Sequence, residues 1–140
     1  EMLLFGGSTK NQGMTADAYV LDTRTWAWRK LTAAGAAPTP RGSACAAAVD
    51  DNTCVVFGGA GLGGGGYAGG AGLTPFDETW TIKVEGDNAV WTRLDLGAPP
   101  APRVAASLSR LSSGELLLHG GWTPTTKETF EESHVLKFDI

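Results

Sequence analysis

The 140-residue sequence predicts an all-β fold made of repeated four-stranded antiparallel sheets. Three observations support this prediction. An apolar strand runs into a pair of glycines three times, and the pairs stand 52 and then 62 positions apart. Short segments rich in Val, Leu, Thr, Trp and Tyr alternate with clusters of Gly, Pro, Asp and Asn, as strands alternate with turns. No window shows a sustained helical period of apolar residues. Repeats of about 50 residues with four short strands each are typical of β-propeller blades.

The second copy is expected to contain a full set of four strands. An inner strand is expected over 42–49, and a tight turn at 50–52 leads to a second strand over 53–57. A third strand is expected around 79–84 and a fourth around 91–94, with a polar turn between them. Four such strands joined in order form an antiparallel meander, which is the unit of a propeller.

The first and third copies each lack one strand. The first starts at the second strand of the unit, and the third stops soon after its third strand. We therefore expect a partial blade over 1–40, a complete blade over 41–97 and a partial blade over 98–140. Propellers close with roughly four to eight blades, so the chain is expected to be a piece of a larger ring. Assembly of several copies into one ring is the less favoured alternative, because each junction would lack two strands.

Two proline-arginine junctions connect the copies. Arg41 and Arg103 stand 62 positions apart, which matches the spacing of the second and third glycine pairs. Proline removes a backbone donor and fixes the entering chain, which suits a crossing between blades. Before the first junction, the stretch 33–37 contains glycine and is followed by proline, so we expect a loop there.

Glycines and large aromatic residues recur at matching places of the repeat. Glycine at the end of the second strand permits backbone angles closed to other residues and lets another segment approach closely. The aromatic side chains are expected to cover this bare backbone and to fill the widening space between wedge-shaped blades. The tryptophan of each fourth strand is expected near the glycine pair of its own unit. These repeated structural residues are Gly6, Gly7, Tyr19, Trp28, Gly58, Gly59, Trp80, Trp91, Gly120 and Gly121.

The pattern resembles the kelch repeat. The resemblance consists of the strand ending in Gly-Gly, the aromatic in the third strand, a tryptophan six residues after Asp22, and the junction Pro38-Thr39-Pro40-Arg41. It covers essentially the whole chain. The sequence departs from the pattern at Lys83, which replaces an aspartate, and at Leu136, which replaces an aromatic.

The resemblance implies a protein–protein interaction scaffold or recognition module rather than an enzyme. The expected partners are other proteins and the remaining blades of the same propeller. The alternative is a propeller attached to an enzyme, such as a ubiquitin-ligase substrate adaptor or a kelch-bearing oxidase or phosphatase, whose catalytic part lies outside this chain. The expected location is the cytoplasm, with the cytoskeleton or the cilium as more specific alternatives.

Composition argues against several other classes of partner. The net charge of −4 and the lack of a basic run disfavour nucleic acid and anionic membranes. No apolar run approaches the roughly 18 residues of a membrane span. In the expected hairpin register Cys45 lies opposite Phe57 and Cys54 opposite Ala48, so no disulfide is expected. Two unpaired thiols favour a reducing compartment.

No catalytic residue, cofactor site or metal site is predicted. The glycine-rich stretch 58–72 contains a G-x-G-x-x-G match, but no helix follows it, so we expect a loop and not a nucleotide site. Glu131, Glu132 and His134 form at most a weak metal set, and a solvated loop end is the favoured interpretation. His119 occupies the position of a phenylalanine in the other copies and is expected to be a packed residue at a strand end.

The two junction arginines have two interpretations. Arg41 and Arg103 could form a ring of guanidinium groups that holds acidic or phosphorylated peptides. Their repetition instead favours a structural role, in which each arginine bridges adjacent blades through backbone carbonyls.

Loop lengths identify the end of the propeller that is expected to bind partners. The loops over 8–16, 60–77 and 122–132 are long and differ in every copy, whereas the turns at 50–52 and 112–114 are minimal. In a meander these two sets lie at opposite ends, and binding residues concentrate on loops held by a rigid scaffold. The candidate contacts at the long-loop end are Tyr67, Phe76, Trp122 and Lys127.

Overall fold

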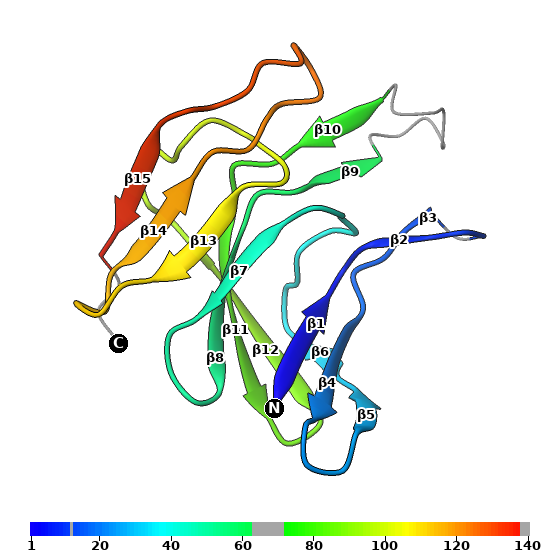
Figure 1. The fold of residues 1–140 in the computed structure, drawn as a ribbon. Helices are drawn as coiled ribbons and strands as arrows, with labels where there is room; N and C mark the ends of the chain where they lie inside the picture. Colours follow the sequence, from blue (N-terminus) through cyan, green and yellow to red (C-terminus); the bar gives the residue numbers. More distant parts are fainter. Residues whose placement is uncertain (12, 63–71, 138–140) are drawn as a thin grey trace.

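The fold is all-β, as the sequence predicts (Figure 1). The structure is a computed structural model that describes residues 1–11, 13–62 and 72–137. Every regular element of these residues is a β-strand, and three sheets of three or more strands follow one another along the chain. The described parts of the chain include no helix with the length and apolarity that a membrane span requires. The sheets form an incomplete propeller, and each is called a blade below.

The first blade has three antiparallel strands. They are β1 (Met2–Phe5), β4 (Ala18–Asp22) and β5 (Ala27–Lys30), in that spatial order. The long loop between β1 and β4 carries a small hairpin of β2 (Ser8–Thr9) and β3 (Gly13–Met14). The blade therefore contains the second, third and fourth strands of the repeat.

The second blade has the four expected strands and one more. The meander runs through β7 (Cys45–Ala48), β8 (Thr53–Phe57), β11 (Thr79–Glu85) and β12 (Asn88–Leu94). The second strand has the predicted bounds, and the fourth starts three residues earlier than predicted. A fifth strand, β6 (Thr32–Ala34), pairs in parallel with the outer edge of β12.

Strand β6 corrects the expectation of a loop over 33–37. Ala33 and Ala34 belong to a strand because their segment pairs with the next blade, with Ala33 opposite Ala89. The amide of Thr32 donates a 2.8 Å hydrogen bond to the carbonyl of Asp87 at the start of this pairing. The connection leaving one blade thus covers the outermost edge of the blade that follows, an edge that would otherwise present unpaired backbone groups.

The third blade holds β13 (Ser107–Arg110), β14 (Leu116–His119) and β15 (Ser133–Leu136), which are its first three strands. The long loop of the second blade carries the hairpin of β9 (Ala60–Leu62) and β10 (Leu73–Pro75). The innermost strands of neighbouring blades, β7 and β13, lie side by side (Figure 1).

The largest hydrophobic core lies between the first and second blades. Trp91, which is 6% exposed, packs its ring 4.7 Å from the ring of Phe5. The expectation that aromatic residues fill the space between blades is met here. Buried members of this core are Ala18, Val20 and Leu31 of the first blade and Val56, Trp80, Ile82, Ala89 and Trp91 of the second.

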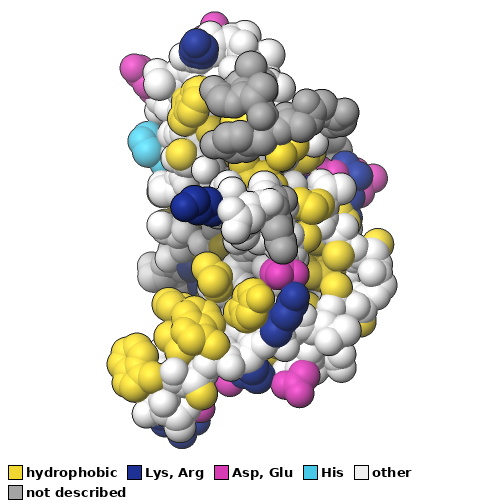
Figure 2. Space-filling model, turned by 90° about the vertical axis from the view of Figure 1, so that its right-hand side faces the viewer, with side chains coloured by type: hydrophobic (Ala, Val, Ile, Leu, Met, Phe, Trp, Pro, Cys, Tyr) yellow, Lys and Arg dark blue, Asp and Glu magenta, His cyan; other side chains and the backbone are white. Residues whose placement is uncertain are grey.

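Trp28 occupies the same place in the first blade but is 50% exposed. Among the described residues no further sheet lies against its face of the first blade. Figure 2 shows hydrophobic side chains exposed together in the lower part of the molecule, where this blade lies. The large exposed hydrophobic residues of the first blade are Met2, Leu4, Trp26 and Trp28.

Backbone atoms, and not tryptophan side chains, lie closest to the glycine pairs. This corrects the expectation that each tryptophan packs near the glycine pair of its own unit. A Cβ atom on Gly58 would lie 2.6 Å from the carbonyl oxygen of Arg103, and one on Gly6 would lie 2.5 Å from that of Arg41. Both glycines have a positive φ, near 69°. Trp91 packs instead on Phe5, which directly precedes the glycine pair of the neighbouring blade. The close approach expected at the glycines is thus made by the segment that starts the next blade.

Candidate functional site

The long loops project from one end of the blades. The hairpins β2–β3 and β9–β10 and the loop before β15 lie toward the top and right of Figure 1, and the short turns lie toward the bottom and left. This arrangement follows from the meander, because alternate connections return to opposite ends of each sheet. The long-loop end is therefore a single region to which all three blades contribute.

Trp122 and Lys127 lie on the long loop of the third blade. The backbone of Trp122 is fixed by hydrogen bonds exchanged with Val104, whereas its side chain remains 39% exposed. Lys127 is exposed and has a φ of 61°, and its amide donates a 2.9 Å hydrogen bond to the carbonyl of Thr123. The loop therefore presents an aromatic and a cationic side chain on a hydrogen-bonded backbone. Tyr67 lies outside the described residues.

Arg41 is buried inside the junction between the first two blades. Its side chain is 1% exposed, and Nη2 donates a 2.7 Å hydrogen bond to Oε2 of Glu78. Nη1 donates to the carbonyl of Gly58 at 3.2 Å, and the guanidinium lies 4.0 Å from the ring centre of Phe76. Its backbone carbonyl accepts a 2.8 Å bond from the amide of Gly7 in the preceding blade.

Arg103 repeats this arrangement one blade later. It donates to the carbonyl of Gly120 at 3.0 Å and to Glu132 at 2.8 Å, and it stacks 3.9 Å from the ring centre of Phe130. Its carbonyl accepts a 3.0 Å bond from the amide of Gly59. The geometry favours the structural interpretation of both arginines, because their donors are directed at groups of the chain itself.

Sequence reasoning missed the acidic and aromatic partners of these arginines. Glu78 follows Phe76 by two positions, and Glu132 follows Phe130 by two positions. This repeated pattern of a phenylalanine, an acidic residue and a glutamate was available as a signal. Phe76, expected at the binding surface, is half-buried and lies against a guanidinium.

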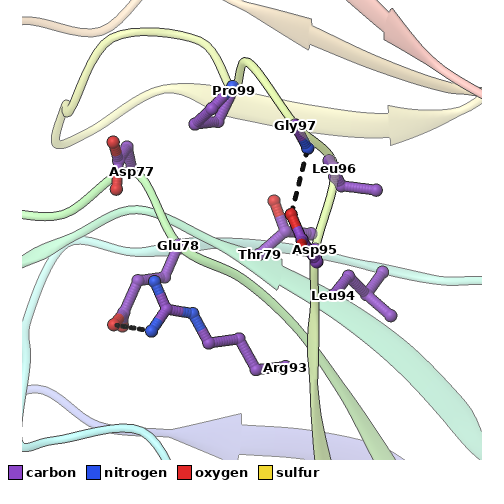
Figure 3. A pocket seen from close by; sticks show the side chains of 9 residues that line it. All are labelled: Asp77, Glu78, Thr79, Arg93, Leu94, Asp95, Leu96, Gly97 and Pro99. Carbon is purple, nitrogen blue, oxygen red and sulfur yellow. Dashed lines mark hydrogen bonds and ion pairs between the residues drawn. The ribbon is translucent and has the colours of Figure 1, made fainter.

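Glu78 is shared between the buried Arg41 and the exposed Arg93, and Figure 3 shows its contact with Arg93. Nη1 of Arg93, whose side chain is 59% exposed, lies 3.5 Å from Oε1 of Glu78. Burial raises the pKa of Glu78, but hydrogen bonds from Arg41 and Trp80 outweigh this effect and hold the pKa below its ordinary value. Glu78 and Arg93 line an open polar pocket of about 530 Å³ together with Asp95, whose carboxylate accepts a hydrogen bond from the amide of Gly97.

Neither histidine enters a metal site in the described part of the chain, where no three His, Cys, Asp or Glu side chains converge. His119 is exposed, which corrects the expectation of a packed residue, since no described sheet covers its face of β14. Its Nδ1 lies 2.8 Å from Oγ of Ser133. His134 Nε2 lies 3.4 Å from Oε1 of Glu132, the carboxylate that Arg103 binds.

An apolar groove of about 540 Å³ opens between the long-loop hairpins of the first and second blades. Side chains from both hairpins and from the proline-arginine junction line it. The two hairpins lie close together, since a Cβ atom added to Gly13 would lie 3.2 Å from Cδ1 of Leu62. The lining residues include Met14, Thr39, Pro40, Leu62, Thr74 and Phe76. Apolar concave surfaces with a few polar groups are typical of binding sites.

The two cysteines are unpaired and have the predicted register, with Cys45 opposite Phe57 and Cys54 opposite Ala48. Burial raises the pKa of the Cys45 thiol from 9.0 to about 11. A raised thiol pKa in the folded state stabilises the protein below pH 9, and this contribution is lost as the pH rises toward 11.

We expect the difference in unfolding free energy between the wild type and Cys45→Ala to shrink between pH 9 and pH 11. Urea denaturation of both proteins over this range measures it. A difference that stays constant with pH would contradict a buried, neutral thiol.

These blades define a repeat protein of the β-propeller class. The family model described as the KLHDC2/KLHL20/DRC7 Kelch-repeats domain matches residues 1–140. The chain belongs to this kelch-repeat family, whose domains are typical protein-interaction modules.

Relatives of the chain are much longer than the chain. It is 34% identical over 143 residues to the flagellar outer-arm dynein alpha chain of Chlamydomonas reinhardtii, covering 97% of the chain and 3% of that protein. It is 40% identical over 63 residues to dynein regulatory complex subunit 7 of the same organism, covering 45% and 5%. It is 26% identical over 121 residues to acyl-CoA-binding domain-containing protein 5 of Arabidopsis thaliana, covering 86% and 17%.

The solved structure of YjhT has a similar fold. It matches with a TM-score of 0.62 at 18% sequence identity, covering 95% of the chain and 37% of that structure. At this identity the likeness concerns the fold alone.

Proposed function

We propose that the chain is a protein-recognition module that binds its partner through the long-loop end. The observation that carries this proposal is the apolar groove between the hairpins β2–β3 and β9–β10, at the end where the loops are long. Such a groove suits an apolar side chain of a partner protein, and the exposed Trp122 on the same end offers an aromatic anchor. Stability and binding are then separate, because the blade interfaces hold the fold and the loops supply variable contacts.

The three sheets are consecutive blades of one larger propeller in this proposal. Their boundaries are 1–40, 41–97 and 98–140, with the exception that β6 is contributed across the first boundary. The exposed apolar face of the first blade and the small share of each relative that the chain covers support this view.

The similarity to a flagellar dynein chain and to a dynein regulatory complex subunit favours a ciliary or cytoskeletal setting. The partners in this setting are other proteins of a motor or axonemal assembly. The alternative remains a propeller attached to an enzyme, and the domains beside this chain in the whole protein distinguish the two.

We expect Leu62→Lys and Trp122→Ala to reduce partner capture without lowering the melting temperature appreciably. Capture of axonemal proteins by the tagged protein, quantified by mass spectrometry, measures the first effect, and thermal denaturation measures the second. Asp51→Ala and Ser113→Ala, which alter short turns at the opposite end, serve as matched controls and should keep the captured proteins. If only the turn variants lost the captured proteins, the binding surface would lie at the short-turn end, and the proposal would be wrong.

A further inference from the structure

Three threonines of the chain are followed directly by proline, and their surroundings differ. Thr39 is exposed in the connection between β6 and β7. Thr74 is also exposed, but it lies in β10 and is paired with Gly61. Thr123 is only 9% exposed. The three dipeptides are therefore chemically alike but differ in how far an enzyme can reach them.

We propose that Thr39 is a phosphorylation site for a proline-directed serine/threonine kinase. Such an enzyme needs an exposed threonine on a segment that it can hold in an extended form. The residue before a proline is already biased toward extended backbone. The proline itself has no backbone N–H, so no hydrogen bond from it has to break when the enzyme binds the segment. Thr39 meets these requirements because both it and Pro40 are exposed outside any strand.

A fixed guanidinium stands beside the hydroxyl that would be modified. Nη2 of Arg41 donates a hydrogen bond to Oγ1 of Thr39 at 3.2 Å, and Nε donates to the carbonyl of the same threonine at 3.1 Å. The arginine side chain is 1% exposed and is held in place by Glu78, Gly58 and Phe76. A phosphate on Oγ1 would therefore lie next to a preorganised cation, which is the usual partner of a phosphorylated residue.

The reaction is an ordinary phosphoryl transfer from ATP. Oγ1 of Thr39 forms a bond to the γ-phosphorus, and the bond from that phosphorus to the bridging oxygen of ADP breaks. The hydroxyl proton passes to the catalytic base of the kinase. The product carries a charge of about −2 near neutral pH.

The modification would place this charge at the rim of the apolar groove. Thr39 lines the groove together with Pro40, Leu62 and Phe76. The phosphate would also compete with Glu78 for Arg41, since both reach the same Nη2 atom. The assignment of the site does not rest on the proposed binding function, because it follows from exposure and from the position of Arg41.

The test is treatment of the purified protein with a mitogen-activated-protein-kinase-class enzyme and Mg-ATP, followed by peptide mass spectrometry over time. We expect Thr39 to be phosphorylated at least ~10-fold faster than Thr123, since Thr123 reacts only after local opening. Thr74 should also lag, because its backbone is paired. Short synthetic peptides centred on each threonine are the matched control and should differ much less. Failure of Thr39 to react in the protein while its peptide reacts, or equal rates at Thr39 and Thr123, would overturn the proposal.

A second measurement tests the role of Arg41. In ³¹P NMR, the titration midpoint of the phosphate on Thr39 should be lower in the folded protein than in the phosphorylated peptide, because a nearby cation favours the dianion. The difference should vanish in concentrated urea. Equal midpoints in the folded protein and the peptide would show that Arg41 does not receive the phosphate.

Discussion

Arg41→Met is expected to lower the free energy of unfolding by about 2–4 kcal/mol, because it removes the buried partner of a carboxylate and of two carbonyls. The variant keeps an unbranched apolar side chain but leaves the carbonyl of Gly58 without its 3.2 Å donor and Glu78 without its 2.7 Å partner. It also removes the group that stacks on Phe76. Urea denaturation monitored by tryptophan fluorescence measures the loss.

Arg93→Met is the matched control, because Arg93 contacts the same glutamate from a largely exposed position. Its cost should stay below about 1 kcal/mol, as for other surface ion pairs. If both variants lost the same stability, burial of Arg41 would not be the source of its contribution.

The ion pair between Arg41 and Glu78 predicts that the stability of the protein depends on pH in the acid range. Because the pKa of Glu78 is held below its ordinary value of 4.5, the pair stabilises the fold above pH 4.5 and loses this contribution as the pH falls through the lowered pKa. Arg41→Met should therefore be less sensitive to acid over that range than the wild type is.

Trp91→Ala should cost about 3–5 kcal/mol, the range for removing a large buried aromatic side chain. Trp91 fills the wedge between the first and second blades, where it contacts Phe5 at 4.7 Å and Trp80 at 6.4 Å between ring centres. The cavity left behind would lie between two sheets, which cannot close on it without tilting a whole blade. Chemical denaturation of the variant measures the cost.

Trp28→Ala provides the internal control, since Trp28 has the same place in the first blade but is half exposed. Its expected cost is about 1 kcal/mol, in keeping with the smaller apolar area that it buries. A cost as large as that of Trp91→Ala would mean that another part of the protein covers this face.

Local pattern was enough to predict the strands and much of their register. The placement of Cys45 opposite Phe57 followed from the length of the turn between their strands, and the observed register agrees. The close approach at Gly58 followed from the freedom of glycine, although the approaching group turned out to be a carbonyl. Strand signals act over a few residues, which is why they are visible in a single sequence.

Features that depend on a second, distant segment were not predictable in the same way. Strand β6 exists because it pairs with β12 of the next blade, and its small residues carry no strand pattern of their own. The burial of Arg41 depends on Glu78 and Phe76, which lie far along the chain. His119 is exposed although its repeat equivalents are phenylalanines, because exposure depends on whether another sheet covers the strand.

Strand β6 also changes what counts as one transferable unit of this protein. A segment cut at residue 41 would leave the second blade without its outermost strand, since that strand lies in residues 32–34. A gene duplication or an engineered insertion that copies a blade in working form would have to start before the proline-arginine junction. The sequence segment that can be copied therefore does not coincide with the residues of one sheet. Each added copy would bring the strand that pairs with the outer edge of its own sheet, and this strand would join it to the preceding blade.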